Sequence, residues 1–327
     1  MKIFRFILSV LIIFSIVFTV FIGKNKINEQ SNLTNPSDYK GIISLWQIDG
    51  FEGGTGSRKQ FLLKVARDFE KKNDGVLVMV SSHTFTSAKE NIDKGILPDL
   101  ISFSNGTAIT EMENINVKRT VEGGKVGDKV YATAWCRGGY VLLRNPNAKN
   151  KEGNTIIVSQ KEYTQPLTAM LLQGIEFENV KVYNPLDAYV NFTLGKTEYF
   201  LGTQRDVVRL TNRDFEFESV PISEYNDLYQ YVALTSKDKT KKAYAKIFID
   251  YLLSDKVQKS LNQISMFSPY LEVEFENEKL AEMQKVKCKK TISVFNHEQI
   301  LLEMQEDALK GLKGNQNAIN KIKNLLI

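Results

Sequence analysis

Residues 187–210 read DAYVNFTLGKTEYFLGTQRDVVRL, and this stretch limits the possible folds more than any other part of the chain. Apolar residues at helical spacing predict a short helix that stops at Gly195, residues 198–201 are typical of a strand, and a second helix is expected to open at Gly202. A strand that leads through a glycine into a helix directs unpaired backbone N–H groups at whatever lies beyond the strand end. Such a turn could hold a polar ligand, or it could be an ordinary connection in an α/β protein.

Strand-like and helix-like segments alternate from residue 41 onward. The predicted segments are strands over 41–46, 76–81 and 100–103 and helices beginning after Ser57 and over 87–94. This alternation predicts an α/β fold with a parallel-rich sheet and right-handed crossovers. Ligands of such sheets bind beyond the carboxyl ends of the strands, so we expect the loops 47–56 and 104–106 to border a binding site.

Five motifs follow one another in a fixed order along the chain. They are GILPDL (95–100), KVY leading to GGYVLLRN (129–145), A-x-x-x-F-x-x-G-K-x-x-Y-x-x-G (188–202), YVALTS (231–236), and a helix pattern with Ala245, Phe248, Leu252 to Asp255 and Gln258. Together they resemble the extracellular solute-binding proteins of ABC importers, family 1, the group that includes maltose-binding protein. The resemblance covers roughly residues 41–270.

The resemblance implies a two-lobed type II periplasmic-binding-protein fold, in which a hinge closes two α/β lobes around a small solute. It also implies an ABC permease as the partner. The implied divisions are lobe 1 over 40–133 and 222–266, lobe 2 over 137–219 and 268–327, and hinge strands near 132–135 and 220–222.

The N-terminal segment indicates where the protein resides. Residues 6–23 carry no charge, are rich in Ile, Leu, Val and Phe, and have basic residues on both sides. The run is about long enough to span a bilayer, and it has neither an A-x-A-like cleavage site nor a lipobox cysteine. We expect residues 1–24 to be a transmembrane anchor and 25–39 a flexible stalk, with the rest on the extracellular face; a cleaved signal segment is the alternative.

The charge balance argues against a nucleic-acid partner. The chain has 43 Lys and Arg residues against 38 Asp and Glu residues. Residues 1–30 hold four of the basic and one of the acidic residues, so the remainder is nearly neutral, with 39 basic against 37 acidic residues. A nucleic-acid-binding domain would instead show an excess of clustered Lys and Arg.

The loop after the first predicted strand, WQIDGFEGGTGSR (46–58), holds the densest group of site-like residues. Its glycines let the backbone pass close to a ligand, and Trp46 offers a flat apolar face. Asp49 and Glu52 could accept hydrogen bonds from hydroxyl groups, while Arg58 could bind an anion. The alternative is a glycine-rich turn that is closed by an internal arginine–carboxylate pair.

Six more residues complete the predicted ligand site. They are Ser104 and Asn105 after the third predicted strand, Trp135 near the first crossing between lobes, Gln204 and Arg205 at the helix that Gly202 opens, and Tyr231 near the return crossing. Trp135 could stack on the ligand or pack the hinge. Arg205 could bind an anion or pair with a neighbouring carboxylate.

No catalytic residue is predicted. His83 and His297 are the only histidines, and the sequence contains no zinc-binding or nucleophile motif, so we predict no enzyme activity, no metal and no cofactor. Cys136 and Cys288 lie in unrelated segments and are expected to be free thiols.

The sequence is compatible with two classes of ligand. Carbohydrate is favoured by the aromatic and carboxylate residues of the 46–58 loop and by the commonest use of the family. An anionic small molecule is the runner-up, because Arg58, Arg137, Arg205 and two helix N-termini could converge on one cleft. A membrane-anchored ligand sensor and, less favoured, an extracellular hydrolase are the other functions that the sequence leaves open.

Overall fold

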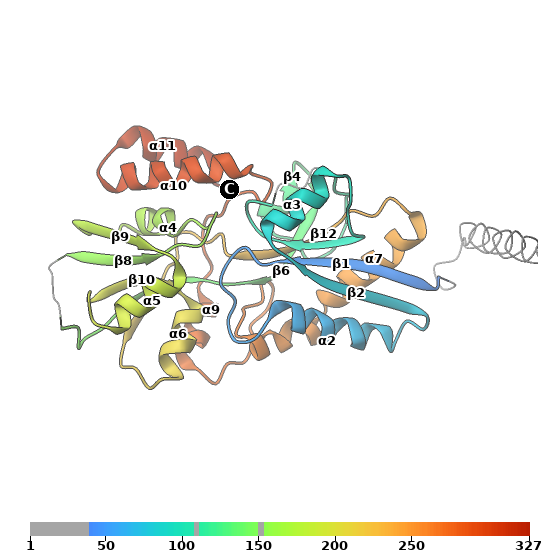
Figure 1. Cartoon of the computed structure of the whole chain (residues 1–327), viewed down its shortest axis with the longest axis horizontal. Helices are drawn as coiled ribbons and strands as arrows, with labels where there is room; N and C mark the ends of the chain where they lie inside the picture. Colours follow the sequence, from blue (N-terminus) through green and yellow to red (C-terminus); the bar gives the residue numbers. More distant parts are fainter. Residues whose placement is uncertain (1–38, 108–110, 150–153) are drawn as a thin grey trace, which may run out of the picture.

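The computed structural model describes residues 39–107, 111–149 and 154–327. The predicted anchor (1–24) lies outside these ranges, as does the predicted stalk (25–39) apart from Tyr39. No helix within the described ranges is long and apolar enough to cross a bilayer. The chain forms two lobes, each built around a five-stranded sheet, and the lobes lie side by side along the long axis of the molecule (Figure 1).

The first lobe contains a sheet with the strand order β2-β1-β3-β12-β6. Its strands are β1 (Gly41–Ile48), β2 (Val76–His83), β3 (Leu100–Phe103), β6 (Ala132–Arg137) and β12 (Tyr229–Leu234). β1, β2 and β3 run parallel, while β12 is antiparallel to both of its neighbours. The helices of this part of the chain are α2 (Arg58–Glu70), α3 (Phe85–Asp93), α7 (Lys239–Leu252), α8 (Asp255–Lys259) and the 3₁₀ turns η2 (Glu122–Gly124) and η3 (Ser260–Ile264). A short hairpin of β4 (Lys125–Val126) and β5 (Lys129–Val130) precedes β6.

Alternating side chains of β1 pack against helices on the two faces of this sheet. Ile43 and Leu45 share a core with α2, whereas Trp46 and Ile48 share another with Ala88 of α3. Figure 1 shows α2 and α3 on opposite sides of the β1–β2 pair. The three strands expected near the N-terminus are confirmed, and their register follows from burying apolar residues on both faces of a parallel sheet.

The second lobe contains a sheet with the strand order β11-β7-β10-β8-β9. Its strands are β7 (Tyr140–Arg144), β8 (Thr155–Ser159), β9 (Asn179–Tyr183), β10 (Tyr199–Thr203) and β11 (Glu218–Pro221). Its helices are α4 (Pro166–Gln173), α5 (Pro185–Thr193), α6 (Gln204–Thr211), α9 (Glu278–Lys285), α10 (Glu298–Leu312) and α11 (Gln316–Leu325). α4 and α10 contribute to the core on one face of the sheet, and α5, α6 and α9 to the core on the other. α11 packs on α10 (Figure 1).

The stretch 187–210 forms a helix, a strand and a second helix, as predicted, with one correction. Gly195 has φ 70° and follows the end of α5, as expected for a residue that ends a helix. Gly202, however, lies inside β10, and α6 begins only after Thr203. Thr203 and Asp206 form a capping box, which fixes the first helical residue at Gln204, two residues beyond the glycine. A Cβ at Gly202 would come within 2.6 Å of Asp206 Oδ2, so this glycine is needed for close approach of that carboxylate.

Two chain segments join the sheets, and a third lies beside them. Gly138 and Gly139 link β6 to β7, and residues 222–228 link β11 to β12. Phe267 pairs with Arg137 beside the first link. The expected hinge near 132–135 is therefore inside the paired strand β6, which continues to Arg137, and the connection between the sheets begins at Gly138. The predicted lobe bounds remain a prediction, although Val294, assigned to lobe 2, packs in the Trp46 core of the first lobe.

Candidate functional site

Loops at the carboxyl ends of strands from both lobes meet in one cleft. In the first lobe these are the loops after β1 and β3, as predicted; in the second they are residues 160–164 after β8 and the start of α6 after β10. The lobes touch across the cleft. Gln204 Nε2 donates a hydrogen bond of 3.4 Å to the carbonyl of Glu52, and the rings of Phe85 and Tyr163 meet edge to face at 5.4 Å between centroids.

One carboxylate of the first lobe is surrounded by cations of the second. Glu52 Oε2 lies 2.9 Å from Arg205 Nε and 3.8 Å from Arg209 Nη2, and Glu52 Oε1 lies 3.8 Å from Lys161 Nζ. These side chains are between 20% and 32% exposed, so water reaches the group and partly screens it. We refer to Glu52, Lys161, Arg205 and Arg209 as the charged cluster.

The charged cluster has more positive than negative charge. Its other acidic neighbour is Asp206, whose Oδ1 lies 3.7 Å from Arg209 Nη1. Burial raises the pKa of Asp206 to about 6, against the hydrogen bond from the Thr203 backbone and the nearby arginine, which lower it. Three cations therefore face two carboxylates, one of which gains a proton in mildly acidic solution, so the cluster can attract an anion.

Arg58 does not take part in the charged cluster. Its Nε donates a 2.7 Å hydrogen bond to Asp49 Oδ1, one Nη donates to the carbonyl of Phe51, and the guanidinium lies 4.3 Å from the Phe51 ring centroid. The alternative considered from the sequence, an internal arginine–carboxylate pair, is what the structure contains, with Asp49 as the partner. Arg58 Nη1 has no hydrogen-bond partner among the described residues.

A small pocket lies beside the charged cluster, between α3 and the loop after β8. It has a volume of about 240 Å³ and is lined by Phe85, Thr86, Lys89, Glu90, Ile92, Asp93, Gly106, Thr107, Tyr163 and Glu298. Phe85 and Tyr163 supply aromatic surface from opposite lobes. Lys89 Nζ and Glu298 Oε1 form an ion pair of 2.7 Å, and Tyr163 Oη donates to Glu298 Oε2 at 3.0 Å. We call this the aromatic pocket.

Two buried hydroxyl groups at the end of β3 have no partner among the described residues. They are Ser104 Oγ and Thr107 Oγ1, in residues only 3% and 6% exposed, and Thr107 lines the aromatic pocket. Buried polar groups are nearly always hydrogen-bonded, so the Thr107 hydroxyl, which lines the pocket, is available to a ligand. Gly106 between them has φ 87°, and a Cβ there would lie 2.0 Å from the Tyr163 ring. The glycine thus allows the lobes to approach.

Asp227 joins both lobes at the base of the cleft. Its carboxylate accepts hydrogen bonds from Tyr140 Oη at 2.7 Å, from Asn105 Nδ2 at 3.2 Å and from the Gln165 backbone N–H at 3.1 Å. Burial raises the pKa of Asp227 to about 6 although these donors favour the charged form. Asn105, predicted to bind the ligand, therefore has its amide directed to Asp227.

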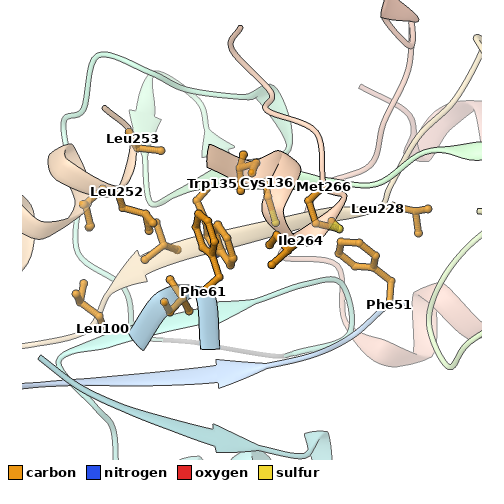
Figure 2. Close-up of a cluster of buried hydrophobic side chains, with 14 of the residues drawn as sticks. Phe51, Phe61, Leu100, Trp135, Cys136, Leu228, Leu252, Leu253, Ile264 and Met266 are labelled. Atoms are coloured by element: carbon orange, nitrogen blue, oxygen red, sulfur yellow. The ribbon is translucent and has the colours of Figure 1, made fainter. Parts of the chain in front are cut away.

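Three predicted aromatic ligand contacts are core residues instead. Trp135 is fully buried, stacks on Phe61 at 5.7 Å and 7°, and donates to Ser102 Oγ at 2.9 Å (Figure 2). Tyr231 is 1% exposed within the core below β3, and Trp46 is 8% exposed and tilted against His83. A buried ring has no free face for a ligand, so the structure does not place these residues in the cleft.

Of the remaining predicted residues, Glu52 and Arg205 lie partly exposed in the cleft, whereas Gln204 is fully buried between the lobes. Glu52, Gln204 and Arg205 face one another there, and Gln204 Oε1 also accepts from the Gly139 N–H at 3.0 Å. Both cysteines are free thiols, Cys136 buried and Cys288 partly exposed.

Sequence reasoning missed the partners that the second lobe supplies. They are Lys161, Tyr163 and Arg209, with Phe85 from α3 and Asp227 from the return crossing. Phe85 could have been found from Thr84 and Ser87, whose capping box starts α3 two residues earlier than the predicted 87–94. Arg209 lies one helical turn after Arg205 and shares its face.

Comparison with known proteins identifies the fold. No protein-family model and no curated protein matches the chain. Among solved structures, a cyclic alpha-maltosyl-1,6-maltose binding protein from Arthrobacter globiformis aligns with TM-score 0.62 at 10% identity, over 87% of this chain and 97% of its own. The sugar-binding protein MalE from Xanthomonas citri aligns with TM-score 0.61 at 16% identity, over 87% and 95%. Iron-bound HitA from Pseudomonas aeruginosa aligns with TM-score 0.54 at 14% identity, over 82% and 99%.

These likenesses confirm the two-lobed type II periplasmic-binding-protein fold. The same fold holds a sugar in some neighbours and iron in another, so the fold alone does not determine the ligand of this chain. The ligand class depends on the residues that line the cleft.

Proposed function

We propose that this protein is the extracellular substrate-binding subunit of an ABC importer and captures a carbohydrate between its lobes. The observation that carries the proposal is the aromatic pocket at the carboxyl ends of β2 and β3, where Phe85 and Tyr163 meet from opposite lobes. Concave sites of this kind, with aromatic walls and a few polar groups, are the usual place for a small ligand. Several structural neighbours are sugar-binding proteins, which supports the same ligand class here.

The pocket chemistry suits a sugar ring. An aromatic face packs against the C–H groups of a ring, and the unpartnered Thr107 hydroxyl, Lys89 and Glu298 can exchange hydrogen bonds with its hydroxyl groups. The volume of about 240 Å³ is slightly below the roughly 300 Å³ at which pockets for drug-sized ligands begin, so one ring fits better than an oligosaccharide.

Closure supplies the transport signal in this proposal. A ligand held by Phe85 on the first lobe gains contacts from Tyr163 and Glu298 only when the lobes meet. Binding energy therefore shifts the population toward the closed form, which the permease is proposed to recognise. None of these steps changes the ligand chemically, so we expect the protein to release it unaltered.

A thermal-shift and calorimetric screen of the full-length protein against neutral sugars tests the proposal. A binding sugar at a hundred times its dissociation constant should stabilise the protein by about 2.7 kcal/mol. Tyr163→Ala should abolish the shift, whereas Tyr183→Ala, a change of the same size on the exposed strand β9, should leave it intact. Equal binding by both variants would show that the sugar does not occupy the aromatic pocket.

An anionic small molecule is the second candidate, because the charged cluster places three cations around one carboxylate. Its affinity should fall with added salt and fall about tenfold or more in Arg205→Gln, since a charge-assisted hydrogen bond is lost. Arg213→Gln is the matched control, because Arg213 packs on Tyr189 and lies outside the cluster. Salt-independent binding would favour the neutral sugar.

Attachment to the membrane is proposed from the N-terminal segment. If residues 1–24 are an uncleaved anchor, the protein should fractionate with membranes at full length. A mature N-terminus found between residues 24 and 39 in the medium would instead establish a cleaved signal peptide.

A further inference from the structure

A second cavity lies beside the segments that connect the lobes. Its volume is about 570 Å³, and its lining includes Arg137 at the end of β6, Tyr229 at the start of β12, residues 268–272 and residues 284–288. None of these residues belongs to the charged cluster or the aromatic pocket. We call it the hinge cavity.

Arg137 has no carboxylate partner within 4.0 Å among the described residues. Its Nη2 donates to the Gln284 carbonyl at 2.6 Å and more weakly to the Val286 carbonyl at 3.4 Å. Its guanidinium lies 5.2 Å from the Phe267 ring centroid. Buried charges in proteins are nearly always paired with an opposite charge, so a partly buried arginine beside an open cavity lacks its usual partner.

Other charges around the hinge cavity are mainly positive. Lys285 and Lys287 line it as well, and neither forms an ion pair with a described residue. Glu272 is the one carboxylate in the lining. Burial lowers the pKa of Arg137, because the surroundings of the guanidinium disfavour its charged form.

A purely structural role explains only part of this arrangement. Arg137 caps the last carbonyls of α9, a favourable place for a cation. The guanidinium has five N–H donors, and besides the Nη2 contacts only Nη1 donates to a described residue, through a long hydrogen bond of 3.5 Å to the Gly138 carbonyl. The two lysines that line the cavity are not needed for helix capping.

We propose that the hinge cavity binds a small molecule through an anionic oxygen group, a carboxylate or phosphate, held by Arg137 with Lys287 and Lys285. Arginine favours such groups because its planar donors match two oxygens at once. The lining includes Arg137 and Tyr229, which directly flank the two links between the lobes, so this ligand would bind apart from the transported solute and next to the hinge.

Cys288 reports on occupancy of this cavity. It lines the hinge cavity and is partly exposed, whereas Cys136, the other cysteine, is fully buried. Burial raises the pKa of the Cys288 thiol to about 11, so its alkylation is slow and can be followed over hours in mildly alkaline buffer. A ligand in the cavity should shield the thiol and slow the reaction further.

The test titrates inorganic phosphate and citrate into the full-length protein, with ionic strength held constant by chloride. We expect saturable binding by calorimetry and a severalfold slower reaction of Cys288 with N-ethylmaleimide, measured by mass spectrometry. Arg137→Gln should weaken binding about tenfold or more, because it removes a charge-assisted hydrogen bond. Lys287→Gln should weaken it less, and Lys313→Gln, an exposed lysine on the α10–α11 connection, should have no effect.

The outcomes separate this cavity from the cleft. If an anion binds but leaves Cys288 reactive and is sensitive to Arg205→Gln, it occupies the charged cluster and the proposal is wrong. If neither anion binds at millimolar concentration, the proposal is also wrong. If Arg137→Gln fails to fold, the double variant Lys285→Gln, Lys287→Gln replaces it, because both lysines are exposed and their loss should not unfold the protein. Loss of Cys288 protection by the anion in this double variant would support the site, and unchanged protection would contradict it.

Discussion

Glu52→Gln should open the cleft in the absence of ligand. Glu52 belongs to the first lobe and its three cationic neighbours to the second, so these ion pairs exist only when the lobes are closed. Only the Arg205 contact, at 2.9 Å, is short enough to contribute much. This contact is a partly exposed ion pair without hydrogen-bond geometry, so it contributes about 0.5 to 1 kcal/mol. The ratio of closed to open molecules should then fall roughly twofold to fivefold.

Single-molecule energy transfer measures this shift directly. Dyes can be attached at Asp74→Cys on the first lobe and Lys196→Cys on the second, both exposed positions, in a Cys288→Ser background. Glu282→Gln, an exposed carboxylate of α9 without a described ion-pair partner, is the control for loss of one negative charge. Arg205→Gln should reproduce the shift, and the double variant should add little to it. If Glu52→Gln gives the same distance distribution as the wild type, the charged cluster does not hold the lobes together.

Three more predictions follow from contacts around the cleft and the core. Burial raises the pKa of Asp227 to about 6, above the roughly 3.9 of an unfolded Asp, so the folded state binds this proton more tightly. The contribution of Asp227 to the free energy of unfolding should therefore fall by about 2 kcal/mol as pH rises from about 4 to about 6. In a urea-denaturation series, Asp227→Asn should remove that contribution and leave the similar one of Asp206. Trp135→Ala should destabilise the protein by about 3 to 5 kcal/mol through the cavity it leaves beside Phe61, and an unchanged melting temperature would contradict the buried position. Gly106→Ala should weaken ligand binding because its Cβ meets Tyr163 across the cleft, whereas Gly314→Ala, at the same φ of 87° but in open space, should lower the melting temperature without changing affinity.

The architecture of each lobe could be predicted because its signals are local. Apolar runs such as Gly41–Ile48 identify buried parallel strands, and the order of strands and helices restricts the topology to few arrangements. The position of the cleft follows, since the carboxyl ends of β1 and β3 are fixed once the strands are known. Glu52, in the loop after β1, was placed at this edge in this way, and Gln204 and Arg205 were placed at the edge after β10; their role as ligand contacts stays a prediction.

The aromatic residues show where local signals fail. Trp46, Trp135 and Tyr231 all stand near strand ends or crossings, yet each is covered by a partner distant in sequence, such as Phe61 on Trp135. An aromatic side chain stabilises the fold most when it is fully buried. Its position in the sequence does not show whether the face of the strand from which it projects is covered by the core or borders the cleft. The aromatic pair that does face the cleft, Phe85 and Tyr163, comes from two lobes and is visible only once they are brought together.

The loop after β8 links the two candidate ligand features. Lys161 points toward Glu52 in the charged cluster, and Tyr163, two residues later, packs against Phe85 in the aromatic pocket. A ligand that carries both a sugar ring and an anionic group would engage both ends of this loop at once. For such a ligand, the losses in binding free energy from Tyr163→Ala and Arg205→Gln should not add, because losing either anchor weakens the geometry of the other. A neutral sugar would respond to the first change alone and a small anion to the second alone, so the same double-mutant cycle distinguishes all three ligand classes in one cleft.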